Sequence, residues 1–180
     1  DLNINPDNPV IGKIERSFSA DPSIVTRHAL KVIEGHHKFG VLTTLKHFPG
    51  HGSSQDDSHR GFVDVPKTWT RAELEPYARI IAAGQADAIM TAHVFNANLD
   101  PDYPATLSRK IVTGILRDEL LYGGVVISDD MQMKAIADHF TVEKAAVASF
   151  KAGVDLFLVC HNASVQLEAI TAIANEIDRG

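Results

Sequence analysis

"GVVISDD", at residues 124–130, decides the fold, because it joins a short apolar segment to two acidic residues. Val125, Val126 and Ile127 are consecutive apolar residues, so a strand formed by them buries side chains on both faces. Strands of this kind are typical of parallel sheets, which helices cover on both sides. The stretch therefore predicts an α/β protein with acidic groups at the carboxyl end of one strand.

The same pattern recurs on both sides of this stretch. Further strands are predicted at 41–48, 87–94 and 154–160. Helical spacing of apolar residues predicts helices at 21–40, 70–85, 107–121, 141–153 and 162–177. Thr70 is expected at one helix N-cap, with Glu73 placed for a capping box, and Ser108 is expected to cap another. Strands that alternate with helices in this way predict a parallel α/β fold.

Each predicted strand ends in charged or polar residues. These residues are Lys46 and His47, His93, Asp129 and Asp130, and His161 and Asn162. The carboxyl ends of parallel strands share one edge, which is where barrel enzymes build their active sites. A flavodoxin-like open sheet also fits the alternation, but it would use mainly one switch point. Four polar strand ends favour a (β/α)₈ TIM barrel, and four units in 180 residues amount to about half of one.

Composition places the chain among ordinary globular domains. It has 180 residues, of which 44% are hydrophobic and 22% are charged. A net charge of −6, with no run of Lys or Arg, argues against a nucleic-acid-binding surface. No apolar run is long enough to span a membrane, so we expect neither a nucleic-acid nor a membrane partner. The single cysteine, Cys160, excludes an internal disulfide and is expected to be a buried, inert thiol.

The chain opens on "DLNINPDNPVIG", without a Met and without a clear helix or strand start. We therefore expect the true N-terminus to be missing. The compartment stays open between the bacterial cytoplasm and a secreted or periplasmic location.

The stretch "KHFPGHGSSQDDSHRGFVDV", at residues 46–65, raises a separate question. It contains a long connection, and long connections without regular structure are usually functional. Its histidines, with Asp57 and His93, could supply zinc ligands. Their spacing matches no compact metal motif, such as two histidines one helical turn apart. A polar surface turn is the other alternative, because Asp and Ser favour loops.

The two aspartates that end residues 124–130 are expected to differ. Asp130 is predicted to cap the following helix, for which Asp is a good N-cap residue. Asp129 then points into the mouth of the barrel, where a buried carboxylate is costly unless it is paired or used. His36 and His37 are expected to be surface residues without a role.

Four motifs follow one another along the chain. They are "KHFPGHG" at 46–52, "DSH" at 57–59, "TAHV" at 91–94 and "SDDMQMKAI" at 128–136. Together with "NPDNPVIG", "RSFSADP" and "PATLSRKIVTGILRDELLYGGVVISDDM", they resemble the glycoside hydrolase family 3 β-N-acetylhexosaminidases over nearly the whole chain. The resemblance implies a (β/α)₈ catalytic barrel. It also implies that residues 1–180 are a partial family 3 N-terminal domain, roughly the C-terminal half of the barrel, with the first units before Asp1.

The resemblance implies a retaining β-N-acetylglucosaminidase that works through a covalent glycosyl-aspartate intermediate. Asp129 of "SDDM" matches the nucleophile, His59 of "DSH" the general acid/base, and Asp57 the residue that orients His59. In retaining glycosidases the nucleophilic carboxylate acts at about 5 Å from the acid/base group. A histidine can give and take a proton near neutral pH, and a neighbouring carboxylate can fix its tautomer.

The resemblance also implies a sugar site. Arg16 of "RSF", with Lys46 and His47 of "KHF", matches groups that hold sugar hydroxyls, and His93 of "TAHV" is expected to line the same site. The expected partner is a saccharide that carries terminal β-linked N-acetylglucosamine, from cell wall or chitin fragments. No metal and no organic cofactor is implied. We expect that the missing N-terminal half of the barrel, or a second copy, is needed to complete the fold.

Three other functions stay open. A family 3 β-glucosidase shares the barrel and the aspartate nucleophile, but it takes its acid/base from another domain, which leaves "DSH" unexplained. A metal-dependent barrel hydrolase would use the same histidines as ligands. The chain could also be an inactive half-barrel fragment that binds a sugar or has a structural role.

Overall fold

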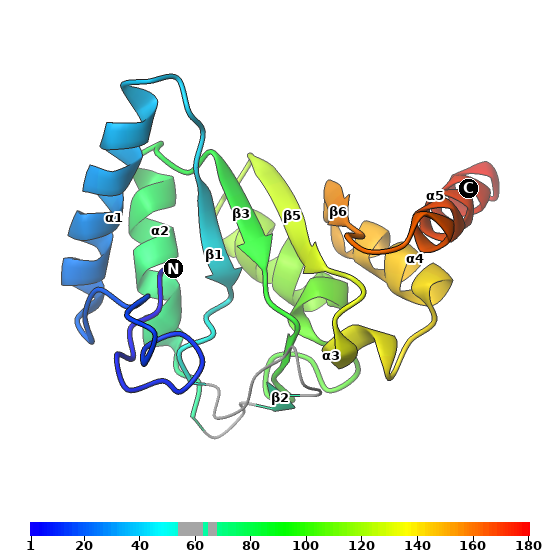
Figure 1. The fold of residues 1–180 in the computed structure, drawn as a ribbon, viewed down its shortest axis with the longest axis horizontal. Helices are drawn as coiled ribbons and strands as arrows, with labels where there is room; N and C mark the ends of the chain where they lie inside the picture. The colour runs from blue at the N-terminus through cyan, green and yellow to red at the C-terminus, as the bar shows by residue number, and fades with distance from the viewer. Residues whose placement is uncertain (54–62, 65–67) are drawn as a thin grey trace.

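Four parallel strands form the centre of the molecule (Figure 1) in the computed structural model, which describes residues 1–53, 63–64 and 68–180. The strands are β1 (Thr44–Phe48), β3 (Ala88–Thr91), β5 (Val125–Asp130) and β6 (Leu156–Leu158). They are hydrogen-bonded in the order β1-β3-β5-β6, and every neighbouring pair is parallel. The predicted α/β fold with a parallel sheet is confirmed.

Helices separate the successive strands. Figure 1 shows α1 (Pro22–His37) and α2 (Glu75–Ala82) side by side next to β1, on one flank of the sheet. The others are η1 (Arg71–Leu74), η2 (Ala105–Leu107), the π-helix η3 (Lys110–Glu119), α3 (Lys134–Ala137), α4 (Val142–Ala152) and α5 (Ala163–Asp178). Within the described ranges, no helix combines the length and the hydrophobicity that crossing a bilayer requires.

Side-chain caps fix where several helices begin. Asp21 accepts the N–H of Ser23 at the start of α1, where Pro22 occupies the first turn. Ser108 Oγ accepts the N–H of Ile111 at 3.1 Å near the start of η3, although the N-cap of η3 itself is Arg109, one residue beyond the predicted cap. Thr70 occupies the N-cap of η1 as predicted, but its side chain makes no capping hydrogen bond.

A second, two-stranded ladder was not predicted. β2 (Val63–Asp64) pairs in parallel with β4 (Val94–Phe95). Each strand has two residues, which is too short for an alternating pattern to be recognised in the sequence. Because β4 follows β3 closely along the chain, the ladder extends the carboxyl end of the sheet (Figure 1).

The main core lies between the sheet and the helices α1, α2 and η3. Phe48, at the end of β1, packs edge to face on Tyr77 of α2, with ring centroids 5.2 Å apart. Both side chains are fully buried, as are Ile80 of α2 and Ile89 of β3. Burying side chains of this size contributes about 1.5–3 kcal/mol each. The carboxyl end of β1 is therefore held firmly against its helices.

The opposite flank is packed less tightly. Ala169 is the one residue of α5 that is buried, whereas Leu167 and Ile170 are each 65% exposed. β6 is an outer strand of the sheet, as β1 is at the other side, and Leu156 of β6 is 44% exposed. The sheet seen in the described residues is thus open, with apolar side chains exposed near its β6 edge.

Two predictions about single residues near β6 are wrong. Asp130 does not cap α3, whose N-cap is Met133; its Oδ1 instead accepts the N–H groups of Gln132 and Cys160. Cys160 is exposed rather than buried, because β6 ends two residues before it and the chain turns outward there.

His37 also has a role that was not predicted. Its Nε2 lies 2.8 Å from Asp87 Oδ2, and the same oxygen accepts the N–H and the hydroxyl hydrogen of Thr43. These contacts tie the end of α1 to the segments that lead into β1 and β3. His37 therefore stabilises the amino end of the sheet, opposite the end that carries the predicted site.

Candidate active site

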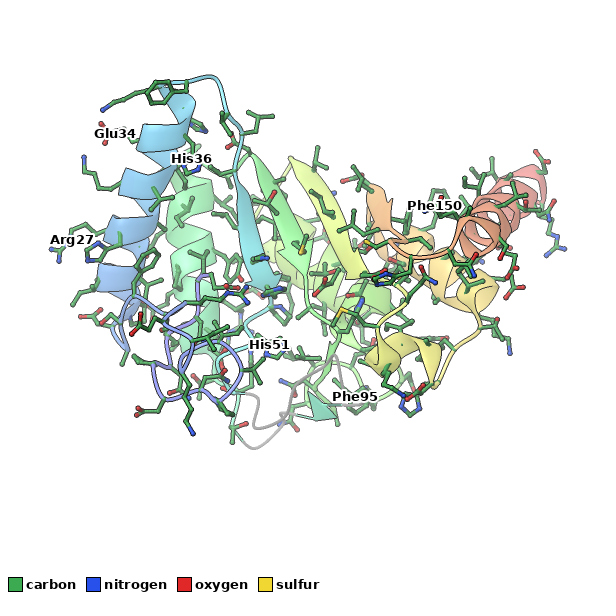
Figure 2. All side chains as sticks on the ribbon, in the orientation of Figure 1. Arg27, Glu34, His36, His51, Phe95 and Phe150 are labelled. Atoms are coloured by element: carbon green, nitrogen blue, oxygen red, sulfur yellow. The ribbon has the colours of Figure 1, made fainter. Side chains whose placement is uncertain are left out.

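The carboxyl ends of β1, β3 and β5 lie side by side and carry polar side chains. β1 contains Lys46 and His47, β5 contains Asp129, and β3 leads into His93 between them. Figure 2 shows His51 close to the same end of β1. The structure therefore brings these four predicted site residues to one edge of the sheet.

His47 and Asp129 face each other across this edge. His47 Nε2 lies 3.6 Å from Asp129 Oδ2, and the two side chains are 11% and 20% exposed. Asp129 Oδ1 accepts the N–H of Asp130 at 2.8 Å, which fixes the carboxylate against its own backbone. Burial lowers the pKa of His47, the Asp129 carboxylate acts in the opposite direction, and the charge of Lys46 adds to the lowering. A carboxylate held in this way at a rigid strand end suits a nucleophile.

Asp1 belongs to the site, although no sequence pattern pointed to it. Its side chain is 2% exposed and lies between Arg16 and His47. Oδ2 is 2.5 Å from Arg16 Nη2, and Oδ1 is 2.8 Å from His47 Nδ1. The second distance is short, but within the described residues neither Oδ1 nor Nδ1 has a hydrogen-bond partner, so this is a close polar contact and not a hydrogen bond. Through Asp1, the predicted residue Arg16 is joined to the site.

The backbone near Asp1 runs along the end of β1. Leu2 donates its N–H to the carbonyl oxygen of Lys46 at 2.8 Å. Asp1 and Lys46 also line a cavity of about 110 Å³ between α1 and β1. The peptide bonds Lys46–His47 and Phe48–Pro49 are both cis. The backbone of Lys46 is thus held next to the N-terminal segment that begins with Asp1 and Leu2.

His93 is buried rather than open to a substrate, with an exposed fraction of 2%. Its Nε2 lies 2.9 Å from Asp130 O, and since a carbonyl only accepts, Nε2 carries a hydrogen. Burial lowers the pKa of the ring, and the other ring nitrogen, Nδ1, lies 2.9 Å from Thr106 Oγ1. Both nitrogens are engaged within the protein. The geometry therefore gives His93 a supporting position at the end of β5, and it does not support the predicted contact with a sugar.

Glu73 holds the start of the predicted catalytic loop, residues 50–53, which we call the loop stem. Its buried carboxylate accepts the N–H of Gly52 at 3.0 Å and the hydroxyl hydrogen of Ser53. From the N-terminal segment, Asn8 Nδ2 donates to the carbonyl oxygens of His51 and Gly52, at 3.2 and 3.0 Å. Burial raises the pKa of Glu73, and the hydrogen bonds that it accepts oppose this rise. Glu73 thus holds the loop stem in addition to the start of its own helix.

Two glycines let this stem pass close to its neighbours. A Cβ placed on Gly50, whose φ is +120°, would lie 2.5 Å from Glu73 Oε2. A Cβ placed on Gly52 would lie 2.6 Å from Asn3 Oδ1. Neither position can carry a side chain unless its neighbours move.

Asp57 and His59, the predicted acid/base pair, lie outside the described residues. The chain is described up to Ser53 before them and again in β2 after them. Among the residues that the structure does describe, no group of three or more His, Cys, Asp or Glu side chains is arranged to hold a metal ion. The roles of Asp57 and His59 stay predictions.

The fourth polar strand end, after β6, also reaches β5. His161 Nε2 lies 3.0 Å from Asp130 Oδ2, and Gln132 Oε1 accepts the N–H groups of His161 and Asn162. The carboxyl end of β6 is therefore tied to β5, as expected for strand ends that share one edge. His161 itself is 75% exposed, so it stands at the rim of the site.

A much larger cavity lies away from these strand ends. It has a volume of about 1070 Å³, lies between α4 and α5, and is lined among others by Tyr103, Phe140 and Leu167. None of the described predicted site residues lines it. Cavity size therefore does not mark the candidate site in this molecule, whereas the convergence of polar strand ends does.

Comparisons with known proteins identify the family of this chain. The family model for the glycosyl hydrolase family 3 N-terminal domain matches residues 1–180. β-Hexosaminidase A of Pseudoalteromonas piscicida is 40% identical over 88% of this chain, which spans 29% of that protein. A solved family 3 β-N-acetylglucosaminidase from Paenibacillus sp. str. FPU-7 has a TM-score of 0.91 and 41% identity, and covers 100% of this chain and 34% of its own.

A more distant solved structure belongs to a β-glucoside phosphorylase. It has a TM-score of 0.85 and 27% identity, and the match covers 100% of this chain and 34% of the phosphorylase. The chain thus spans about a third or less of the length of these relatives.

Proposed function

Because this chain belongs to glycosyl hydrolase family 3, whose N-terminal domain matches it throughout, we propose that the complete protein is a retaining β-N-acetylhexosaminidase. It releases terminal β-linked N-acetylglucosamine from cell-wall or chitin-derived glycosides. Relatives named β-hexosaminidase and β-N-acetylglucosaminidase, at 40% and 41% identity, support this substrate class. The activity is proposed for the whole protein, since the chain spans only part of those relatives.

The observation that carries the proposal is the Asp129 carboxylate at the end of β5, with Oδ2 facing His47 at 3.6 Å. This edge of a parallel α/β sheet is where enzymes place their reacting groups. The Asp129 side chain is 20% exposed, so a substrate can reach it while much of its hydration is already removed.

The proposed reaction has two steps. In the first, Asp129 attacks the anomeric carbon, and the bond from that carbon to the leaving oxygen breaks. His59 gives its proton to that oxygen, so the aglycone leaves as an alcohol. In the second, neutral His59 takes a proton from water, the water oxygen attacks the same carbon, and Asp129 is released as a carboxylate. Asp57 accepts the ring N–H of His59 and orients it, and two inversions leave the configuration unchanged.

Arg16, Lys46 and His47 are proposed to hold the sugar hydroxyls, which orients the anomeric carbon toward Asp129. Their positions at the end of β1, or next to it through Asp1, support this role. His93 is proposed to support the end of β5 from within the protein instead of binding the sugar.

We also propose that residues 1–180 form roughly the C-terminal half of a (β/α)₈ catalytic barrel, and therefore a partial family 3 N-terminal domain. The open edges at β1 and β6 support this, because a closed barrel has no edge strands. The exposed Leu167 and Ile170 of α5 support it as well, since apolar side chains need cover. The isolated chain is then inactive unless the other half, or a second copy, completes the site.

The test is hydrolysis of a chromogenic β-N-acetylglucosaminide by the complete protein, with Asp129→Ala and His59→Ala measured beside the wild type. Loss of the nucleophile should lower turnover by about 10³-fold or more. Asp102→Asn is a matched control, because this carboxylate is 68% exposed and its partner Lys110 lies 3.7 Å away at the surface. Wild-type turnover in both Asp129→Ala and His59→Ala would contradict the proposal.

The similarity to a β-glucoside phosphorylase favours one second candidate function. Phosphate, rather than water, would then take the sugar from Asp129, and glucosides would be the donors. The cationic groups of Lys46 and Arg16 at the strand ends are compatible with an anion nearby. Product analysis with and without inorganic phosphate, on glucosides and on N-acetylglucosaminides, separates the candidates: a glycosyl phosphate identifies phosphorolysis, and free sugar identifies hydrolysis.

A further inference from the structure

Asp1 is a buried carboxylate for which the proposed reaction has no use. Its side chain is 2% exposed, and its two oxygens face two different residues, Arg16 and His47. Burying a carboxylate is costly unless a cation or hydrogen-bond donors compensate for the lost water. We propose that Asp1 is a positioning residue, which holds the Arg16 guanidinium and the His47 ring in place for sugar binding.

The contact with Arg16 fixes the reach of a long side chain. Arg16 lies on the N-terminal segment, outside any helix or strand, and its side chain is 40% exposed. A side chain of that length on a loop samples many rotamers, and an ion pair at 2.5 Å restricts them. Asp1 therefore brings the guanidinium to the end of β1, which the backbone of residue 16 alone does not ensure.

The contact with His47 favours one position of the ring hydrogen. It lacks the geometry of a hydrogen bond, but a carboxylate oxygen 2.8 Å from Nδ1 repels a lone pair on that nitrogen, so a hydrogen on Nδ1 is favoured. In the neutral ring Nε2 is then an acceptor, on the side where Asp129 Oδ2 lies 3.6 Å away. A sugar hydroxyl placed there can donate to Nε2. Asp1 thus acts through His47 as the outer carboxylate acts on many metal-bound or catalytic histidines.

This inference rests on the proposed function, because it concerns how Arg16 and His47 hold the sugar. In the complete protein, Asp1→Asn keeps the shape of the side chain and removes its charge. We expect kcat/KM on the N-acetylglucosaminide to fall by about 10–100-fold, the usual effect of losing such an outer partner. Most of the loss should appear in KM, since hydroxyl binding is already made in the ground state.

A double-mutant cycle separates positioning from a general structural effect. If Asp1 acts through Arg16, then Asp1→Asn should cost at least several-fold less in an Arg16→Gln background than in the wild type. Asp102→Asn, on the exposed carboxylate, serves as the control and should leave kcat/KM unchanged in both backgrounds. Unchanged kcat/KM in Asp1→Asn, or effects of Asp1→Asn and Arg16→Gln that simply multiply, would overturn the inference.

A measurement that does not depend on turnover distinguishes the positioning role of Asp1 from the proposed function. In histidine labelled with ¹⁵N, the ring signals of His47, assigned with a His47→Gln variant, report which nitrogen carries hydrogen. We expect hydrogen on Nδ1 in the wild type and a changed pattern in Asp1→Ala. Identical ring signals in both proteins would refute the positioning role, even if the enzyme is active. Conversely, the expected change in a protein that cleaves no glycoside would leave Asp1 in its role and refute the proposed function alone.

Discussion

On the β1 flank of the sheet, α1 and α2 bury Val25, Ile33 and Ile80 against the strands, whereas on the β6 flank α5 buries Ala169 and leaves Leu167 exposed. The candidate site lies on the β1 flank. The end of β1 is packed from behind, and the N-terminal segment with Asp1 closes against it. The difference teaches that the rigid part of the site is already well supported within these residues, while the second flank still requires cover, in line with the proposed barrel.

The largest expected effect is on the well-packed flank. Phe48→Ala removes a fully buried ring that packs on Tyr77, so it should lower the free energy of unfolding by about 3–5 kcal/mol. Phe150→Ala is the matched control, because Phe150 of α4 is 39% exposed, and it should cost far less. Urea denaturation of both variants measures this. Equal losses would remove the contrast between the flanks.

A smaller effect is expected between the flanks, where β3 and β5 meet. Thr106→Val removes a buried hydroxyl that donates to Ala92 O and contacts His93 Nδ1, each at 2.9 Å. The partners lose their hydrogen bonds without access to water, which should cost about 1–3 kcal/mol. Thr106→Ser, which keeps the hydroxyl, should recover most of the loss in a thermal or urea unfolding assay. A serine variant as unstable as the valine variant would assign the cost to packing instead.

Glu73 should make the stability of the β1 flank depend on pH. Burial raises its pKa, so the folded state favours the protonated acid. This group therefore weakens folding at neutral pH, and stability is gained as the pH falls through the raised pKa toward the ordinary value of 4.5. Glu73→Gln removes the titration. The difference in the free energy of unfolding, wild type minus Glu73→Gln, should increase as the pH is lowered from 7 to 4.5. A difference that stays constant or decreases as the pH is lowered contradicts the assignment.

The smallest effect is expected on the β6 flank. Leu167 of α5 is 65% exposed, so Leu167→Ala should change the stability of the 180-residue chain by no more than about 0.5 kcal/mol. If a closed barrel covers α5 in the complete protein, the same substitution should cost about 2 kcal/mol or more there. Unfolding measurements on both forms compare the two values. The same small change in each would count against the barrel.

Much of the fold could be predicted because its signals are local. Asp21 before Pro22 and Ser108 before an apolar helix mark helix starts through contacts only two or three residues away. The continuous apolar run of 125–127 likewise indicates a strand, but the predicted burial of both faces is wrong, because Val125 is 45% exposed while Val126 is fully buried. The β2–β4 ladder could not be predicted, because each of its strands has two residues and depends on a partner distant in the sequence.

The residues of the candidate site also divide into those that a local sequence pattern indicates and those that depend on distant contacts. Lys46, His47 and Asp129 could be predicted to lie together because they come at the ends of apolar strands that share one edge. Asp1 was missed because its contacts to Arg16 and His47 are long-range, and no local pattern encodes them.

One error has the same cause. Asp130 resembled a helix cap, but its carboxylate accepts the N–H of Cys160, which comes from the neighbouring strand end. The predicted place of His93 in the sugar site stays a prediction, and its two nitrogens contact Thr106 and the backbone of Asp130.

The glycines of the loop stem limit which positions can be varied when the specificity of this protein is changed by directed evolution. Gly50 and Gly52 have no room for a side chain, because Glu73 and Asn3 lie within 2.6 Å of where a Cβ would be. A library that randomises either position would therefore contain members in which Glu73 or Asn3 must move to make room. Diversity is better introduced at positions other than these glycines and the proposed catalytic residues Asp57 and His59, with the stem kept constant.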